Sequence, residues 1–165
     1  MSMRENRSTL GFAAAVLAIV SSLASVVPAH AAGPFQYFAV TPCRVVDSRT
    51  TNATEGTTST PLSNGLHSFR IQGQCGIPNG ALATTMNLTV VGPNQVGHLV
   101  VFPSNASEPI VSTLNYVAGE PALANGAITP LGPVSQPTDK DLTVRLSMAA
   151  PGHSDFIVDV TGYFQ

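Results

Sequence analysis

Four charged side chains are the first candidates for chemistry in this sequence. Arg44, Asp47 and Arg49 lie close together on what reads as one strand, and Asp159 lies on another strand near the C-terminus. Two carboxylates and two guanidinium groups could form a general acid, a general base and an anion clamp, as in a small hydrolase using Asp47 and Asp159. The alternative is an ion-pair network at the end of a sheet, because a guanidinium group binds a carboxylate through two parallel hydrogen bonds. We favour this structural interpretation, since sugar hydrolysis also needs a cleft with aromatic walls and the chain has no Trp and only three Tyr.

Metal-binding residues are scattered along the chain. His67, His98 and His153 lie far apart in sequence, so a metal site would require their convergence in space. Asp139 and Asp141 lack the further oxygen ligands of a calcium loop. We therefore predict no metal, no cofactor and no catalytic residue set.

The first residues have the pattern of a signal peptide. Two arginines precede an apolar stretch from Leu10 to Val27, and Ala29-His30-Ala31 provides a small-x-small cleavage motif. The alternative is an uncleaved membrane anchor, because the apolar stretch is almost long enough to span a bilayer. Three serines and Pro28 interrupt it, however. We predict a signal peptide over residues 1–31 and a secreted, extracellular domain over residues 32–165 with no membrane span.

The two cysteines, Cys43 and Cys75, both lie in the exported part. Oxidising conditions outside the cell let such a pair persist as a disulfide, and we expect them to be bonded to each other. A nucleophilic cysteine or a metal ligand would need a nearby base or further ligands, which the spacing does not supply. Closing this loop should stabilise the fold by roughly 3 to 4 kcal/mol.

Alternation of apolar and polar residues predicts the strands that position these side chains. It is complete from Asp141 to Met148, repeats from Thr85 to Val91, and places Phe156, Val158 and Val160 on one face of a C-terminal strand. Shorter strand-like runs, bounded by Pro, Gly or Asn, occur at 35–40, 44–47, 67–71, 98–102, 111–117 and 122–130.

About nine strands and no helix indicate an all-β domain. Outside the signal peptide no window shows helical periodicity, and 13 prolines and 14 glycines punctuate the chain. We predict a single two-sheet β-sandwich with jelly-roll or Greek-key connections, and a closed barrel as the alternative. The polar segments 50–65 and 130–140 read as long loops, which are the default contact surfaces if there is a ligand.

The charge of the exported part disfavours one class of partner. Five Lys and Arg stand against eight Asp and Glu, which gives a net charge of −3. Nucleic-acid binding needs several cations aimed at phosphates, so we expect no nucleic-acid partner.

From Phe35 to Phe164 the sequence resembles a secreted bacterial all-β module that occurs as repeats or at the C-terminal end of exported and cell-surface proteins. The resemblance rests on motifs in the family's order: TPCRVVDSR at 41–49, CGIP at 75–78, NLTVV at 87–91, STLN at 112–115, AN at 124–125 and DVTGYF at 159–164. It implies a β-fold and an extracellular or cell-surface setting, and it implies no reaction. The proline-rich stretch from Pro133 to Asp141 departs from it, because the family usually has a tight turn there.

Three functions are compatible with these features. The first is a non-enzymatic extracellular module with a structural, adhesive or interaction role, which contacts a cell-envelope or matrix component or copies of itself. The second is a carbohydrate-binding module, although aromatic residues, on which sugars stack, make up only 6% of the chain. The third is the small hydrolase using Asp47 and Asp159.

Overall fold

The computed structural model describes residues 33–52 and 57–165, and Gly33–Gln165 forms one compact unit. The predicted signal peptide over residues 1–31 lies outside the described residues. Within the described ranges the chain forms strands and turns and no helix, so the all-β prediction is confirmed. In the same ranges no helix is long and apolar enough to cross a membrane.

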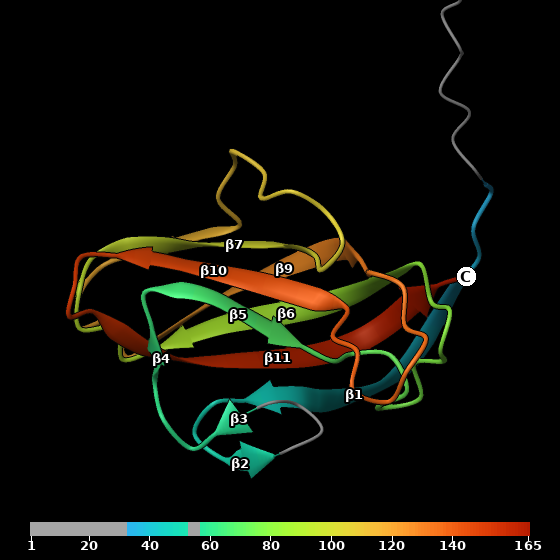
Figure 1. Ribbon diagram of the computed structural model, residues 1–165, viewed down its shortest axis with the longest axis horizontal. Coiled ribbons are helices and arrows are strands. Elements are labelled where there is room, and N and C mark those ends of the chain that lie inside the picture. Colours follow the sequence, from blue (N-terminus) through green and yellow to red (C-terminus); the bar gives the residue numbers. More distant parts are fainter. Residues whose placement is uncertain (1–32, 53–56) are drawn as a thin grey trace, which may run out of the picture. The chain divides into compact units, whose positions relative to one another are not determined.

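Nine strands build two separate antiparallel sheets, as predicted for a sandwich and not for a closed barrel (Figure 1). One sheet has the order β1-β11-β6-β9, and a short strand, β4, also pairs with β11. The other has the order β5-β10-β7-β8. The strands of the first sheet are β1 (Tyr37–Asp47), β4 (Leu62–Ser63), β6 (Ala83–Val91), β9 (Ala122–Pro130) and β11 (His153–Phe164). Those of the second sheet are β5 (Gly65–Phe69), β7 (Gly97–Pro103), β8 (Leu114–Tyr116) and β10 (Leu142–Met148).

Most connections run from one sheet to the other. From β5 to β11, only β7 and β8 follow each other within a sheet. The strand β11, at the C-terminal end of the unit, lies between β1, at its N-terminal end, and β6.

The core lies between the sheets and includes the apolar faces that alternation predicted. Met86, Leu88 and Val90 of β6 are buried, as are the apolar residues of β10 and Phe156, Val158 and Val160 of β11. The faces of β10 and β11 that point away from the core are less exposed to solvent than expected. The alternation places Asp141, Thr143 and Ile157 on the faces opposite the core, yet they too are buried, with exposed fractions of 0%, 6% and 5%.

Several strand boundaries differ from the predictions, and the run expected at 111–117 is a strand only over Leu114–Tyr116. Two further differences change the elements themselves. The expected runs 35–40 and 44–47 are one strand, β1, whose pairing with β11 shifts register between Ala39 and Cys43 and again between Arg44 and Val46. These irregularities break the alternation on which the prediction depended. The expected loop 50–65 contains β4 and a small hairpin of β2 (Thr51–Asn52) and β3 (Thr57–Thr58).

Candidate functional site

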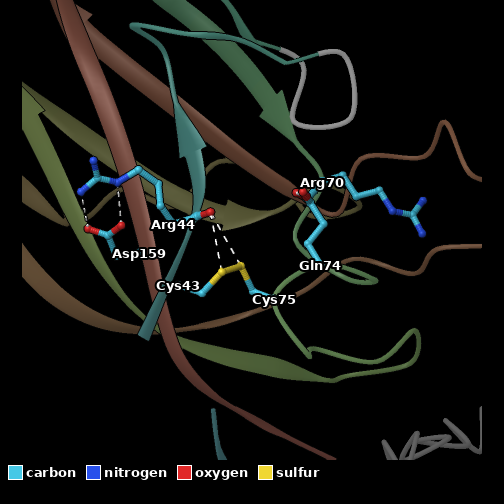
Figure 2. The surroundings of a disulfide bond; sticks show 6 residues. All are labelled: Cys43, Arg44, Arg70, Gln74, Cys75 and Asp159. Carbon is cyan, nitrogen blue, oxygen red and sulfur yellow. Dashed lines mark hydrogen bonds and ion pairs between the residues drawn. A yellow bond between two sulfur atoms is a disulfide. The ribbon is translucent and has the colours of Figure 1, made fainter. Parts of the chain in front are cut away.

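The charged residues singled out in the sequence meet on the edge strand β1 and its neighbour β11. Arg44 lies opposite Asp159 in the strand register, and its guanidinium donates two hydrogen bonds to that carboxylate, Nε to Oδ1 at 2.8 Å and Nη2 to Oδ2 at 3.1 Å (Figure 2). Its Nη1 also lies 3.4 Å from Oδ2 of Asp47. Arg44 therefore bridges the two carboxylates that a hydrolase would need.

Asp47 is held by a second guanidinium group. Arg49 donates from Nε and Nη2 to its two carboxylate oxygens at 2.8 Å each, and the Arg49 backbone amide donates to Oδ1 at 3.1 Å. Arg49 was expected on the same strand as Asp47, but it lies in the turn just after β1 ends. Because the chain turns there, the side chain of Arg49 folds back onto Asp47.

These contacts set the proton affinities of the network. The hydrogen bonds from Arg49 hold the pKa of Asp47 below its ordinary value, against the opposing effect of burial. The hydrogen bond to Asp159 raises the pKa of Arg44. A general acid needs a carboxyl whose pKa lies near the working pH, and the shift of Asp47 goes the other way.

The predicted disulfide between Cys43 and Cys75 is present. It ties β1 to the loop after β5, and both sulfur atoms lie within 3.9 Å of the carbonyl oxygen of Arg44 (Figure 2). Arg70 lies beyond the disulfide in the same view, and its guanidinium points away from it (Figure 2).

A groove of about 860 Å³ lies between the loop that follows β5 and the loop that precedes β10. The second loop is the proline-rich segment that the sequence marked as a possible contact surface. Seven of the ten lining residues have polar or charged side chains, and two of these are cations. The ten are Arg70, Gly73, Gln74, Asn79, Val134, Ser135, Gln136, Pro137, Thr138 and Lys140. Neither Asp47 nor Asp159 is among these residues.

Arg70 fastens the two walls of the groove to each other. Its side chain is buried and donates from Nε to the carbonyl of Gln72 at 2.9 Å, from Nη1 to the carbonyl of Gln136 at 2.8 Å, and from Nη2 to Oδ1 of Asn79 at 3.1 Å. Gln74 also donates from its side-chain amide to the carbonyl of Arg70. The guanidinium thus holds one loop against the other.

Two further buried polar residues reinforce this junction. Asp141 accepts hydrogen bonds from the backbone amides of Ile71 and Gln72, each at 2.7 Å. The side chain of Gln72 donates to the carbonyl of Gly132 and accepts from the amide of Gly80, again at 2.7 Å each. Burial raises the pKa of Asp141, although both amide hydrogen bonds act to lower it. The groove is therefore a preformed surface and not a gap between independent loops.

Sequence reasoning missed Arg70, Gln72 and Asp141 as a group. Their partners are mostly backbone atoms, and the contacts from Asp141 span 69 and 70 residues of sequence. The only signal of this group in the sequence was the polar pair Arg70 and Gln72, which flank Ile71 just after the residues that form β5.

Most of the residues considered as metal ligands have other partners. Nε2 of His67 lies 2.8 Å from the carbonyl oxygen of Ser63, and Nδ1 of His153 lies 2.9 Å from Nδ2 of Asn94. Asp139 accepts from the backbone amides of Ser135 and Gln136, which lowers its pKa. Across residues 33–52 and 57–165, no three His, Cys, Asp or Glu side chains are grouped closely enough to hold a metal ion. This applies to His98 as well.

Comparison with known proteins adds no assignment. Neither the models of protein families nor the curated proteins include a match to this chain. The proposed role therefore depends on the geometry described above.

Proposed function

We propose that this protein is a secreted, non-enzymatic extracellular module that binds a polar component of the cell envelope or matrix through the groove beside Arg70. The observation that carries the proposal is the junction of Arg70 with Gln136 and Asn79, which holds the two walls in place before any ligand arrives. A site that needs no ordering on binding loses less conformational entropy, so polar contacts alone can give useful affinity.

Two features support an extracellular setting. Residues 1–31 have the pattern of a signal peptide, and the Cys43–Cys75 disulfide is compatible with an oxidising compartment. The resemblance to exported bacterial modules leads to the same expectation.

The ion-pair network supports a non-catalytic role. Arg44 and Arg49 neutralise Asp47, and Arg44 binds both oxygens of Asp159. A carboxylate engaged in this way is a poor proton donor, and neither residue lines the groove in which a substrate would sit.

The groove favours a ligand rich in hydrogen-bonding groups over a stacked sugar. The lining side chains include the amides and hydroxyls of Gln74, Asn79, Ser135, Gln136 and Thr138, together with the cations Arg70 and Lys140. All ten lining residues are described, and none of them is aromatic. Sugar-binding faces generally use aromatic rings as platforms, so the carbohydrate-binding alternative draws less support from this surface.

A sedimentation assay tests the proposal. The purified protein is mixed with insoluble cell-envelope material, and separately with cellulose and with chitin, and its depletion from the supernatant is measured. We expect depletion by envelope material only, and weaker depletion of the double variant Gln136→Ala, Thr138→Ala, which removes two exposed side chains of the groove.

The matched control is Gln36→Ala, at another exposed glutamine outside the groove lining. Equal depletion of the double variant and the control would overturn the groove as the contact surface. Depletion by cellulose or chitin would favour the carbohydrate-binding alternative, and release of soluble sugar that Asp47→Asn abolishes would favour the hydrolase.

A further inference from the structure

The strand β9 is a long edge strand whose outer side has no partner strand within the described chain. It is the last strand of the order β1-β11-β6-β9, and it pairs with β6 over all nine of its residues without a bulge. The ladder continues beyond both ends of the strand. The amide of Leu131 donates to the carbonyl of Leu82, and the amide of Gly92 donates to the carbonyl of Pro121.

The parity of this ladder shows which backbone groups face away from β6. Since Pro121 and Leu131 both bond toward β6, the odd-numbered residues of β9 bond to β6. The even-numbered residues Ala122, Ala124, Gly126 and Ile128 then direct their amides and carbonyls outward. The same four residues are exposed, and Ile128 has an exposed fraction of 66%.

β9 lacks the features that normally protect an edge. Between its ends it has no charged residue, no proline and no bulge, whereas β5 and β8 are short edge strands with five and three residues. Its middle residue, Gly126, would find no atom within 4 Å of an added Cβ, and its backbone is not in the left-handed region. A glycine inside a strand that forms no bulge commonly marks a place where another backbone approaches.

We propose that β9 pairs with β9 of a second copy of this chain in an antiparallel, two-fold arrangement. The outward amides and carbonyls alternate in partial charge, and an extended strand with the same alternation complements them. A two-fold axis through the middle of the strand places Gly126 opposite Gly126 and Ala124 opposite Ile128. Every pair on that face then combines a small residue with a larger one or with another glycine, and no charge has to be buried.

This contact is separate from the groove, because no β9 residue lines it. The two five-stranded sheets would become one continuous sheet across the dimer. Such a contact is isologous, so it closes at two copies and does not propagate into fibres.

Light scattering after size-exclusion chromatography, over a range of protein concentrations, tests the proposal. We expect a mass of two chains at high concentration. Gly126→Lys should weaken the dimer by roughly tenfold or more, because like charges directly opposite each other destabilise a strand pair. Gly126→Ala is the matched control, since it adds the Cβ without the charge, and it should remain dimeric.

A second variant and a second measurement keep the test decisive. Ala124→Pro removes one outward amide and should also yield the monomer. Hydrogen exchange should show that the amides of Ala124, Gly126 and Ile128 are protected in the parent and exposed in Gly126→Lys. A parent that is monomeric at all concentrations, with these amides exchanging rapidly, would overturn the proposal. A dimer that survives Gly126→Lys but is lost in Leu66→Lys would assign the contact to β5 and overturn it as well.

Discussion

The two edges of the five-stranded sheet are built in opposite ways. The strand β1 contains Pro42, and its pairing with β11 shifts register twice. The Cys43–Cys75 disulfide and the ion pairs of Arg44 fasten it to its surroundings. At β9 the ladder is regular, no side chain is charged, and the even-numbered residues, whose backbone groups face outward, are exposed. Both strands occupy the same kind of position in one sheet.

The difference shows what the residues that look catalytic are doing. The charged cluster lies at an edge strand and consists of Arg44, Asp47, Arg49 and Asp159. Its ion pairs fix the register of β1, and its charges oppose the pairing of the open side with another strand. Charge, proline and irregular pairing are standard ways to achieve this. The edge without them, β9, is the one to which an additional strand can bind.

The largest expected effect comes from removing the covalent link at the β1 edge. Replacing both cysteines, Cys43→Ser with Cys75→Ser, frees a loop whose ends are 32 residues apart. The chain-entropy model gives a loss of roughly 3 to 4 kcal/mol in the free energy of unfolding, or a fall of roughly 10 to 15 °C in Tm. Calorimetry of the parent and the double variant, each with and without reductant, measures it. A double variant as stable as the parent would show that β1 is held by its other contacts.

A pair of proline substitutions compares the two sides of β9. Ala127→Pro removes an amide that bonds to β6 and leaves its acceptor unpaired, which should cost roughly 2 to 3 kcal/mol. Ala124→Pro removes an outward amide, and it should cost about 1 kcal/mol or less in the monomer, because an edge strand tolerates proline on its open side. Urea unfolding at low protein concentration measures both, and similar losses in the two variants would contradict the parity assigned to the ladder.

Breaking the ion pairs at β1 should have a moderate effect. Asp47→Asn removes the charged acceptor of Arg49, and the Asp47 side chain is only 11% exposed. We expect a loss of about 1 to 2 kcal/mol in the free energy of unfolding. Glu108→Gln is the control. The Glu108–Arg145 ion pair is exposed, its Nε and Oε2 atoms lie 3.5 Å apart, and it should contribute little to stability. A stable Asp47→Asn variant that loses a measured activity would revive the enzymatic interpretation.

The smallest effect is the pH dependence that Asp47 confers. Its pKa in the folded state is lowered, so its contribution is complete above the ordinary value of about 3.9 and is lost as the pH falls through that value toward the folded pKa. The stability difference between the parent and Asp47→Asn should therefore shrink below about pH 4. Asp141 is present in both proteins, so its contribution cancels in this difference. Its raised pKa would otherwise make stability fall as the pH rises, which is the opposite of the effect of Asp47. A difference that stays constant from pH 7 to pH 2 would contradict the assignment.

The sequence predicted the parts of the fold that depend on local periodicity. The apolar positions of β6, β10 and β11 alternate, and these strands provide much of the core. It also indicated the charged cluster, because Arg44, Asp47 and Arg49 are neighbours in the chain. It could not predict the groove, since Arg70, Gln72 and Asp141 are defined by backbone partners across loops. Their residue types are those of ordinary surface residues, and only the topology buries them.

The position of β11 between β1 and β6 has a consequence for the order of events during synthesis. Both neighbours leave the ribosome before β11 does, so the five-stranded sheet cannot assemble until this late segment has emerged. Until then, the β1 segment lacks its partner strand and β6 lacks one of its two neighbours in the sheet. Folding of the unit is therefore delayed until nearly the whole of it is available, as expected for a topology dominated by pairings between distant segments.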